Sequence, residues 1–206
     1  MLGVNVTVPV ACFRKGMARE FLETEALPPP ATCYGFLLSL TGETSRYAHT
    51  GVRIAPALLS AEGPSVVLRT VWRVKSVPLG SKGNERPDYQ QLLTNVRLVV
   101  WFDSSGESSV PNLEKRVSDA LTEPSLIKRF GGLSLGESTH LVDEVSLLKS
   151  IPQVPARTFL IRQNGRLTLP VWVDHVGSAG TRYVTGDLVE GPLAQPELAA
   201  MPVIEP

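Results

Sequence analysis

The first twelve residues carry the pattern that most constrains the fold. Every even position from 2 to 12 holds Leu, Val or Cys, whereas the odd positions are mixed or polar. The apolar residues are Leu2, Val4, Val6, Val8, Val10 and Cys12. Side chains of a β-strand alternate between the two faces of a sheet, so this two-residue period predicts a half-buried strand.

A helix is predicted next, in the segment "LPPPATCYGFLLSLTGE". Pro30 suits the first turn of a helix, because its fixed φ and missing N–H cost nothing there. Cys33, Leu37 and Leu40 recur at helical spacing, and Gly42 can close the C-terminus.

The middle of the chain predicts a projecting β-ribbon. Val52, Ile54 and Leu58 alternate in a strand, and "SVVLRTVWRVKSV" continues the pattern after Gly63 and Pro64. In that segment Val66, Leu68, Trp72 and Val74 share one face, while Arg69, Arg73 and Lys75 share the other. The polar stretch "PLGSKGNERPDY" then leads into a further strand, "LLTNVRLVVWFD". The ribbon is expected over about residues 69–93.

The second half predicts one more helix and several strands. Apolar residues repeat every four positions in 111–124, between two prolines that begin and end a helix. Asn164 and Gly165 separate "RTFLIRQ" from "RLTLPVWVDHV" and are typical of a tight hairpin turn. Another strand is expected in "TRYVTGDLV", followed by an irregular Pro-rich tail, 192–206, that orders on a partner.

This order of elements lacks repeated βαβ units and therefore favours an α+β fold with a largely antiparallel sheet. An RNA-recognition or ferredoxin-like core fits that order. We expect one domain over residues 1–191, with the ribbon as an insertion, additional C-terminal strands, and the tail after them.

Composition excludes some functions. Lys plus Arg and Asp plus Glu are both 20, so any attraction to nucleic acid must come from local clustering. Cys12 and Cys33 have no ligand-spaced partners, so we expect free thiols, no metal and no cofactor. A signal peptide or an apolar span of about 18 residues is not indicated, which predicts a cytoplasmic protein without membrane contact.

Residues 129–138, "RFGGLSLGES", contain the pattern G-x-S-x-G around Ser134. A nucleophilic serine of this kind needs a strand before it and a helix after it, with an acid and a histidine downstream. Here a helical segment is expected before the glycines, although Asp143 or Asp174 with His175 could formally complete a triad. The Gly-Lys-Ser/Thr ending of a nucleotide loop is missing as well, so the segment favours a loop that approaches a phosphate backbone or a protein surface.

Two groups of cations have the spacing of an RNA-binding surface. The first is the basic face of the ribbon with the loop after it, and the second stands where the first strand ends. The members are Arg69, Arg73, Lys75, Lys82 and Arg86, and then Arg14, Lys15 and Arg19. The competing interpretation is an ordinary charged strand face, which also keeps strand edges from pairing.

The histidines His49, His140 and His175 could serve as general acids or bases. Tyr47, His49 and Arg53 lie close enough in sequence to suggest metal-free RNA cleavage. The alternative for such a His is hydrogen bonding or base stacking.

One long stretch, "PVACFRKGMAREFLETEALPPPATCYGFLLSLTGE", resembles the fifth family of CRISPR-associated (Cas) proteins, and so does "GGLSLGES" followed by "HLVDEV". The resemblance implies a subunit of a type I Cascade surveillance complex with an RNA-recognition-like (RAMP-type) fold and a protruding thumb. Such a subunit caps the 5′ end of the crRNA, grips its 5′ handle, contacts the neighbouring backbone subunit and the large subunit, and meets target DNA only through the complex. The 69–93 ribbon would be the thumb.

The resemblance favours binding over catalysis, with a metal-independent ribonuclease as the alternative. His49 lacks an evident Lys-His pair later in the chain, which the cleaving branch of the family uses together with a tyrosine. The shared motifs contain Arg14, Thr32, Tyr34, Gly131, Gly132, Ser134 and Gly136. The full set of expected RNA contacts, thought to form one ridge, adds Lys15, Arg19, Arg46, Tyr47, His49, Arg53, Arg69, Arg73, Lys75, Lys82, Arg86, Arg129 and Ser138.

Overall fold

A computed structural model of the protein describes residues 1–206 except 17, 19, 73–80 and 177. Its strands are β1 (Leu2–Ala11), β2 (Phe21–Leu22), β3 (Arg53–Ser60), β4 (Ser65–Trp72), β5 (Glu85–Asp103), β6 (Glu144–Leu147), β7 (Pro155–Ile161), β8 (Leu167–Trp172) and β9 (Arg182–Pro192). Its helices are α1 (Pro30–Leu40) and α2 (Leu113–Thr122), with short 3-10 turns at Lys82–Asn84, Pro124–Leu126 and Leu198–Ala200.

The main sheet has the order β6-β1-β5-β3-β7-β9-β8, and its neighbouring strands are antiparallel. β4 and the short β2 pair with the first half of β5, β4 antiparallel and β2 parallel. The predicted α+β class with a largely antiparallel sheet is confirmed. No helix in the described part of the chain is long and apolar enough to cross a membrane.

β1 follows its predicted alternation only as far as Val8. Val4, Val6 and Val8 are buried, but Val10 is 36% exposed, and Ala11 is buried in its place. The pairing with β5 passes from Val8 to Val10 without a partner for Pro9, which has no N–H to donate. The prediction that Val10 faces the core is therefore wrong, although the register with β5 is unbroken and Cys12 is buried as predicted.

Both helices begin and end near the predicted residues. α1 begins at Pro30 and is followed by Gly42, whose φ of +70° is the left-handed conformation that ends many helices. A Cβ added to Gly42 would lie 2.3 Å from the carbonyl oxygen of Lys128, so this approach requires glycine. α2 begins after Asn112, whose side chain accepts a hydrogen bond from the amide of Lys115 at 2.9 Å.

The core lies between the helices and the sheet. α1 packs against β3 and β8, while α2 packs against α1 and β6. A second, smaller apolar cluster around Trp101 and Met201 includes Leu193 from the C-terminal tail. The tail is irregular, as predicted, but it packs against its own chain instead of requiring a partner to order it. The amide of Gly51 donates to the carbonyl of Ile204 at 2.8 Å, and Met201 and Ile204 are fully buried.

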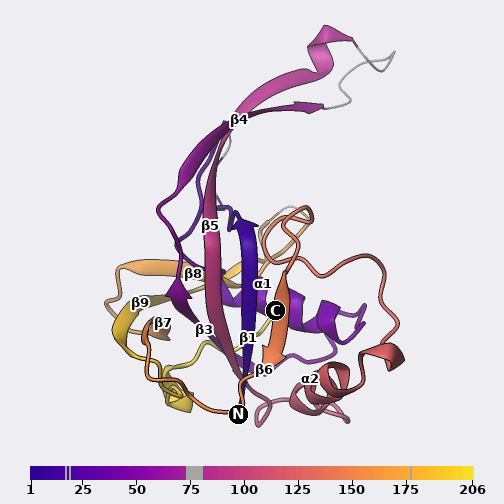
Figure 1. The fold of residues 1–206 in the computed structure, drawn as a ribbon, viewed down its shortest axis with the longest axis vertical. Coiled ribbons are helices and arrows are strands. Elements are labelled where there is room, and N and C mark those ends of the chain that lie inside the picture. The colour runs from indigo at the N-terminus through magenta and orange to yellow at the C-terminus, as the bar shows by residue number, and fades with distance from the viewer. Residues whose placement is uncertain (17, 19, 73–80, 177) are drawn as a thin grey trace.

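The ribbon of β4 and β5 extends away from the body (Figure 1). Its pairing begins at Ser65, earlier than predicted. Val66 and Leu68 are 54% and 61% exposed, so the described side chains of the predicted apolar face cover no core. Val74 and the side chain of Trp72, which were predicted on the same face, lie outside the described residues. The ribbon is thus held by strand pairing and by contacts near its base.

The predicted hairpin at Asn164 and Gly165 is wrong, because β9 lies between β7 and β8. β7 pairs with the second half of β9, residues 186–192, and β8 pairs with the first half, residues 182–186. The connection therefore crosses over β9. A Cβ on Gly165 would lie 2.2 Å from the carbonyl oxygen of Gly186, so glycine serves the crossing instead of a two-residue turn.

Candidate functional site

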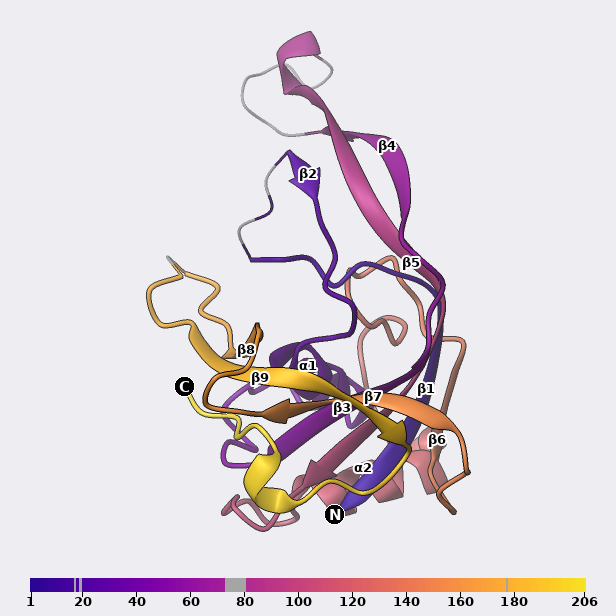
Figure 2. The same ribbon diagram turned by 90° about the vertical axis from the view of Figure 1, so that its left-hand side faces the viewer.

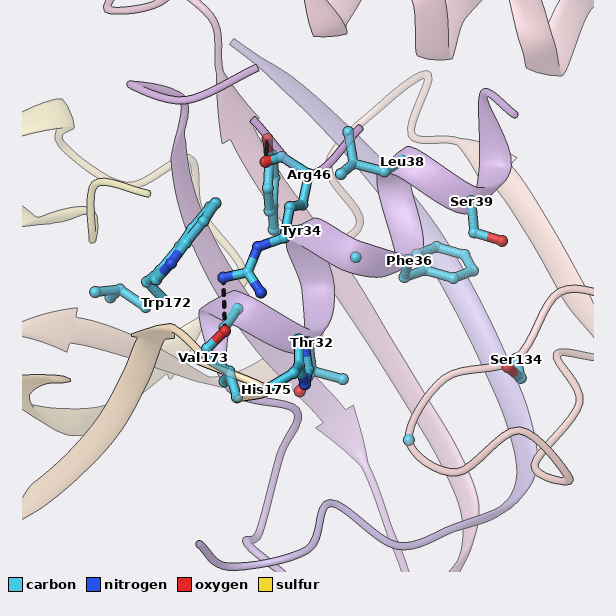
Figure 3. Close-up of a pocket in the computed structure, with 14 residues that line it drawn as sticks. Thr32, Tyr34, Phe36, Leu38, Ser39, Arg46, Ser134, Trp172, Val173 and His175 are labelled. Atoms are coloured by element: carbon cyan, nitrogen blue, oxygen red, sulfur yellow. Dashed lines mark hydrogen bonds between the residues drawn. The ribbon is translucent and has the colours of Figure 1, made fainter. Parts of the chain in front are cut away.

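A cavity of about 370 Å³ lies between α1, the end of β8 and the glycine-rich loop (Figure 3). Five residues expected to contact RNA line it, and they come from three separate parts of the sequence. They are Thr32, Tyr34, Arg46, Ser134 and Gly136. The remaining lining residues include Trp172, Val173 and His175 from the end of β8 and the segment after it.

Arg46 is the cation of this cavity, and its guanidinium is held in one orientation. Its central carbon lies 3.8 Å from the ring centroid of Trp172, and one of its nitrogens donates to the carbonyl of Val173 at 2.6 Å. Tyr47 packs against the same indole with ring centroids 5.2 Å apart, yet it stays 62% exposed. A cation and an exposed aromatic ring thus share one indole support.

Tyr34 supports the chain behind Arg46. Its hydroxyl donates to the carbonyl of Arg46 at 2.8 Å and accepts from the amide of His49 at 3.3 Å. Burial is the main cause that raises the pKa of Tyr34 to about 12, so the hydroxyl stays protonated. With only 4% of its surface exposed, Tyr34 is poorly placed to stack on an RNA base.

A second cavity, of about 490 Å³, continues the first along α1. The two share Gly35, Leu38, Ser39 and Arg46, and the second adds Glu43, Lys128, Arg129 and Phe130 among its lining residues. We call the two cavities together the α1 groove. Ala31, Gly35 and Ser39 repeat every four residues in α1, so small side chains form the floor and leave room for a chain to lie close.

The glycine-rich loop is docked onto the end of β1. The ring Nδ1 of His140 accepts from the amides of Cys12 and Glu137 at 3.1 and 3.3 Å. Burial lowers the pKa of His140, which suits a neutral ring in this accepting role. Gly136 has a φ of +103°, and a Cβ there would lie 2.7 Å from the carbonyl oxygen of Cys12.

Ser134 does not have the surroundings of a nucleophile. The described residues before it form a 3-10 turn at Pro124–Leu126 and then irregular chain, and Ser134 itself makes only an isolated bridge with Leu141. The expected helix before the glycines is limited to that short turn. The loop exposes Gly131, Gly132 and Ser138 and lacks the strand-to-helix turn that presents a nucleophilic serine.

Glu137 joins this loop to the base of the ribbon. Its carboxylate accepts from Arg69 at 3.0 and 3.4 Å and from the side-chain amide of Gln90 at 3.0 Å. Further along the ribbon, Arg86 pairs with Asp88 at 2.8 Å. The two described ribbon arginines that were expected to contact RNA are therefore engaged by carboxylates of this chain.

Other expected contacts lie away from the groove. His49 is 1% exposed, and its two ring nitrogens face Glu107 and Arg116, so the ring cannot reach a ligand on the surface. Arg53 donates to carbonyls of the C-terminal tail. At the end of β1, Arg14 donates to the carbonyl of Ala18, and Nζ of Lys15 lies 3.5 Å from a carboxylate oxygen of Glu23. Arg19, Arg73, Lys75 and the side chain of Lys82 fall outside the described residues.

Among the described residues, the expected cations thus occupy separate places instead of the single ridge that was expected. Trp172, Lys128 and Phe130 were not among the expected contacts, and His175 was considered only as a general acid or base and as a member of a triad. Phe130 is fully exposed between Arg129 and two glycines, and that "KRFGG" pattern is the signal that could have identified it.

Comparison with known proteins identifies the family. No protein-family model matches the chain. The CRISPR-associated protein Cas5 of Myxococcus xanthus (strain DK1622) is 52% identical over 208 residues, which cover 99% of this chain and 97% of that protein. The chain belongs to the Cas5 family. The family resemblance found in the N-terminal stretch and the glycine-rich loop is confirmed.

Two solved structures share the fold of this Cas5 chain. A chain of a CRISPR RNA-guided surveillance complex matches with a TM-score of 0.64 at 12% identity, covering 93% of this chain and 89% of its own. A Cas protein crystal structure matches with a TM-score of 0.54 at 13% identity, covering 94% and 95%. At these identities the likeness concerns the fold alone.

Proposed function

We propose that this protein is a non-catalytic, RNA-binding subunit of a type I CRISPR Cascade surveillance complex in the cytoplasm. It caps the crRNA, holds the 5′ handle, contacts the neighbouring backbone subunit and the large subunit, and meets target DNA only through the assembled complex. Membership of the Cas5 family and the fold shared with a surveillance-complex chain support this role.

The observation that carries the proposal is the α1 groove. Proteins hold single-stranded RNA with cations that follow the backbone and aromatic side chains on which unpaired bases stack. Arg46, Lys128 and Arg129 line the groove, while Tyr47 and Phe130 stand exposed beside its two parts. We therefore assign the handle to this groove, with the exposed amides of the glycine-rich loop as further donors.

The buried position of His49 disfavours the ribonuclease alternative. A general base must come within hydrogen-bond reach of the hydroxyl that it activates. Both ring nitrogens of His49 already face protein groups, and His49 is not among the residues that line the groove. Incubation of the protein with repeat RNA in EDTA decides the matter, because site-specific cleavage that H49A abolishes would establish the alternative.

Binding of a labelled 5′-handle RNA tests the proposal directly. Removing the cation in R46A should weaken binding by about 10-fold or more and reduce the salt dependence of log K by about 0.7 per lost phosphate contact. The matched control is R166A, which removes a 96% exposed arginine in the crossing loop and should leave binding unchanged. Equal losses in R46A and R166A, or equal affinity for a scrambled RNA, would contradict specific handle binding in the groove.

A further inference from the structure

The segment of residues 43–51 connects α1 to β3 and carries Arg46 and Tyr47. It contains turns but no helix or strand. Few backbone hydrogen bonds within it define its path, such as the one from Ala48 to Ser45 at 3.2 Å. Its shape must therefore be set by side chains that reach it from elsewhere.

Arg116 of α2 holds the beginning of this segment. Its guanidinium pairs with one carboxylate oxygen of Glu43 and donates to the carbonyl of Thr41 at 3.3 Å. The other carboxylate oxygen of Glu43 accepts from the amide of Ser45 at 2.7 Å. The hydrogen bond from Arg116 is the main cause that holds the pKa of Glu43 below its ordinary value, so the carboxylate remains charged.

Arg116 and Glu107 together fix the end of the segment through His49. One guanidinium nitrogen of Arg116 lies 3.0 Å from Nε2 of His49, and Nδ1 of His49 contacts a carboxylate oxygen of Glu107. An arginine only donates, so Nε2 must accept and Nδ1 must carry the proton that it donates to Glu107. This bonding defines the neutral Nδ1–H tautomer of His49.

Glu107 stays charged although its side chain is fully buried. Burial by itself raises its pKa, but hydrogen bonds from His49, Ser104 and the amide of Leu113 outweigh that effect and leave the pKa lowered. The Leu113 amide, at the start of α2, lies 2.8 Å from the second carboxylate oxygen. Glu107 therefore connects α2 to His49 with both of its oxygens.

We propose that Glu107 and Arg116 are positioning residues for the α1 groove, acting on Arg46 and Tyr47 without touching the RNA. The amide of His49 donates a hydrogen bond to the Tyr34 hydroxyl, and this hydroxyl in turn donates to the carbonyl of Arg46. The network is thereby connected to Arg46. Arg46 then lies on Trp172 in the orientation that the groove presents. This inference rests on the proposed RNA-binding function of the groove, and it assigns the pre-organisation of that groove to a buried network.

Limited trypsin digestion tests the positioning without RNA, because Arg46 is itself a cleavage site. In R116M and in E107Q, the bond after Arg46 should be cut about 10-fold faster than in wild type. E107Q weakens the network because the single amide oxygen of glutamine must replace the two carboxylate oxygens of Glu107. The bond after the exposed Arg166 is the internal control and should be cut at the wild-type rate. Equal acceleration at both bonds would mean general destabilisation and would overturn the proposal.

RNA binding distinguishes this inference from the proposed function. R116M and E107Q should bind handle RNA about 5–30-fold more weakly, because part of the binding free energy is spent on ordering the segment. The salt slope should stay at the wild-type value, since Arg46 remains to contact phosphate, whereas R46A lowers it. R116K, which keeps the charge but loses the planar fork, should fall between wild type and R116M.

If R116M and E107Q fail to fold, E43Q provides the second test, because the Glu43 side chain is 19% exposed and its loss breaks only the first link. Unchanged cleavage after Arg46 and unchanged affinity in the folded variants would refute the positioning role. If the wild-type protein binds no handle RNA while the variants still expose Arg46, the network positions the segment and the proposed function is what fails.

Discussion

The α1 groove and the ribbon are both candidate contact regions, but they are built in opposite ways. In the groove, Arg46 is fixed by Trp172, by the carbonyl of Val173 and by the hydroxyl of Tyr34. The ribbon is formed by β4 and the first half of β5, with β2 beside it (Figure 2). It has an exposed apolar row, in which Phe21, Tyr89 and Leu68 stand in register on these three strands at 42%, 55% and 61% exposure. The groove is pre-organised by its own chain, whereas the outer ribbon depends on strand pairing.

This difference assigns separate tasks to the two regions. A groove with fixed side chains favours one bound geometry, because little ordering is left for the moment of binding. The described arginines of the ribbon are neutralised by Glu137 and Asp88, which leaves its apolar row as its distinctive surface. We expect changes in the groove to alter folding and RNA affinity together, and changes in the ribbon to alter neither in the isolated chain.

A glycine pair gives the largest expected contrast. Gly42, at the end of α1, has a positive φ and no space for a Cβ, whereas Gly63, at the base of the ribbon, has no atom within 4 Å of a Cβ position. G42A should lower the free energy of unfolding by about 2–4 kcal/mol, because the Lys128 carbonyl must move and the backbone is strained. G63A should change it by less than about 0.5 kcal/mol. Urea unfolding measures both, and a similar cost for the two variants would break the comparison.

Acid should affect the groove through the hydrogen-bonded carboxylates of Glu43 and Glu107. The pKa values of Glu43 and Glu107 are lowered from the ordinary value of 4.5, so their stabilisation is present above that value and is lost as the pH falls through the folded-state pKa. We expect the unfolding free energy of wild type to fall more steeply below about pH 4.5 than that of E107Q, which has one titrating group fewer. Urea unfolding at several pH values gives both curves. Parallel curves would show that Glu107 contributes no pH-dependent stability.

Sequence patterns predicted the elements that depend on local chemistry and missed what depends on tertiary pairing. α1 could be placed because Pro30 and Gly42 act on the backbone where they stand. The Asn164-Gly165 turn was misassigned because local turn chemistry carries no information on β9, Arg182–Pro192, which lies between the two strands. The groove was predicted in part: Arg46 and Ser134 were among the expected RNA contacts, but only folding brings Trp172 beside Arg46.

The same limit explains the cations. Spacing correctly placed Arg69 on a strand face, yet it could not show that Glu137, 68 residues away, would occupy the guanidinium. His49 was expected to contact RNA because it lies near Tyr47 and Arg53 in the sequence, but it is buried by Glu107 and Arg116 from a later part of the chain. A residue's type and neighbours therefore indicated which chemistry is present, but not which charges remain available to a ligand.

The smallest effect on the isolated chain is expected from the ribbon row. L68S and Y89S each remove apolar surface that is already exposed, so the free energy of unfolding should change by no more than about 0.5 kcal/mol and handle RNA affinity should stay the same. V8S is the matched control on the body, because Val8 is 1% exposed and its replacement should cost about 2–4 kcal/mol. If the row serves a neighbouring subunit, as proposed for the complex, L68S and Y89S should instead reduce recovery of that subunit when the complex is co-purified. If L68S and Y89S instead lose RNA affinity while the complex still assembles, the assignment of the ribbon to a neighbouring subunit is reversed. The ribbon would then contact the guide RNA, and the groove would no longer be the sole site that determines binding.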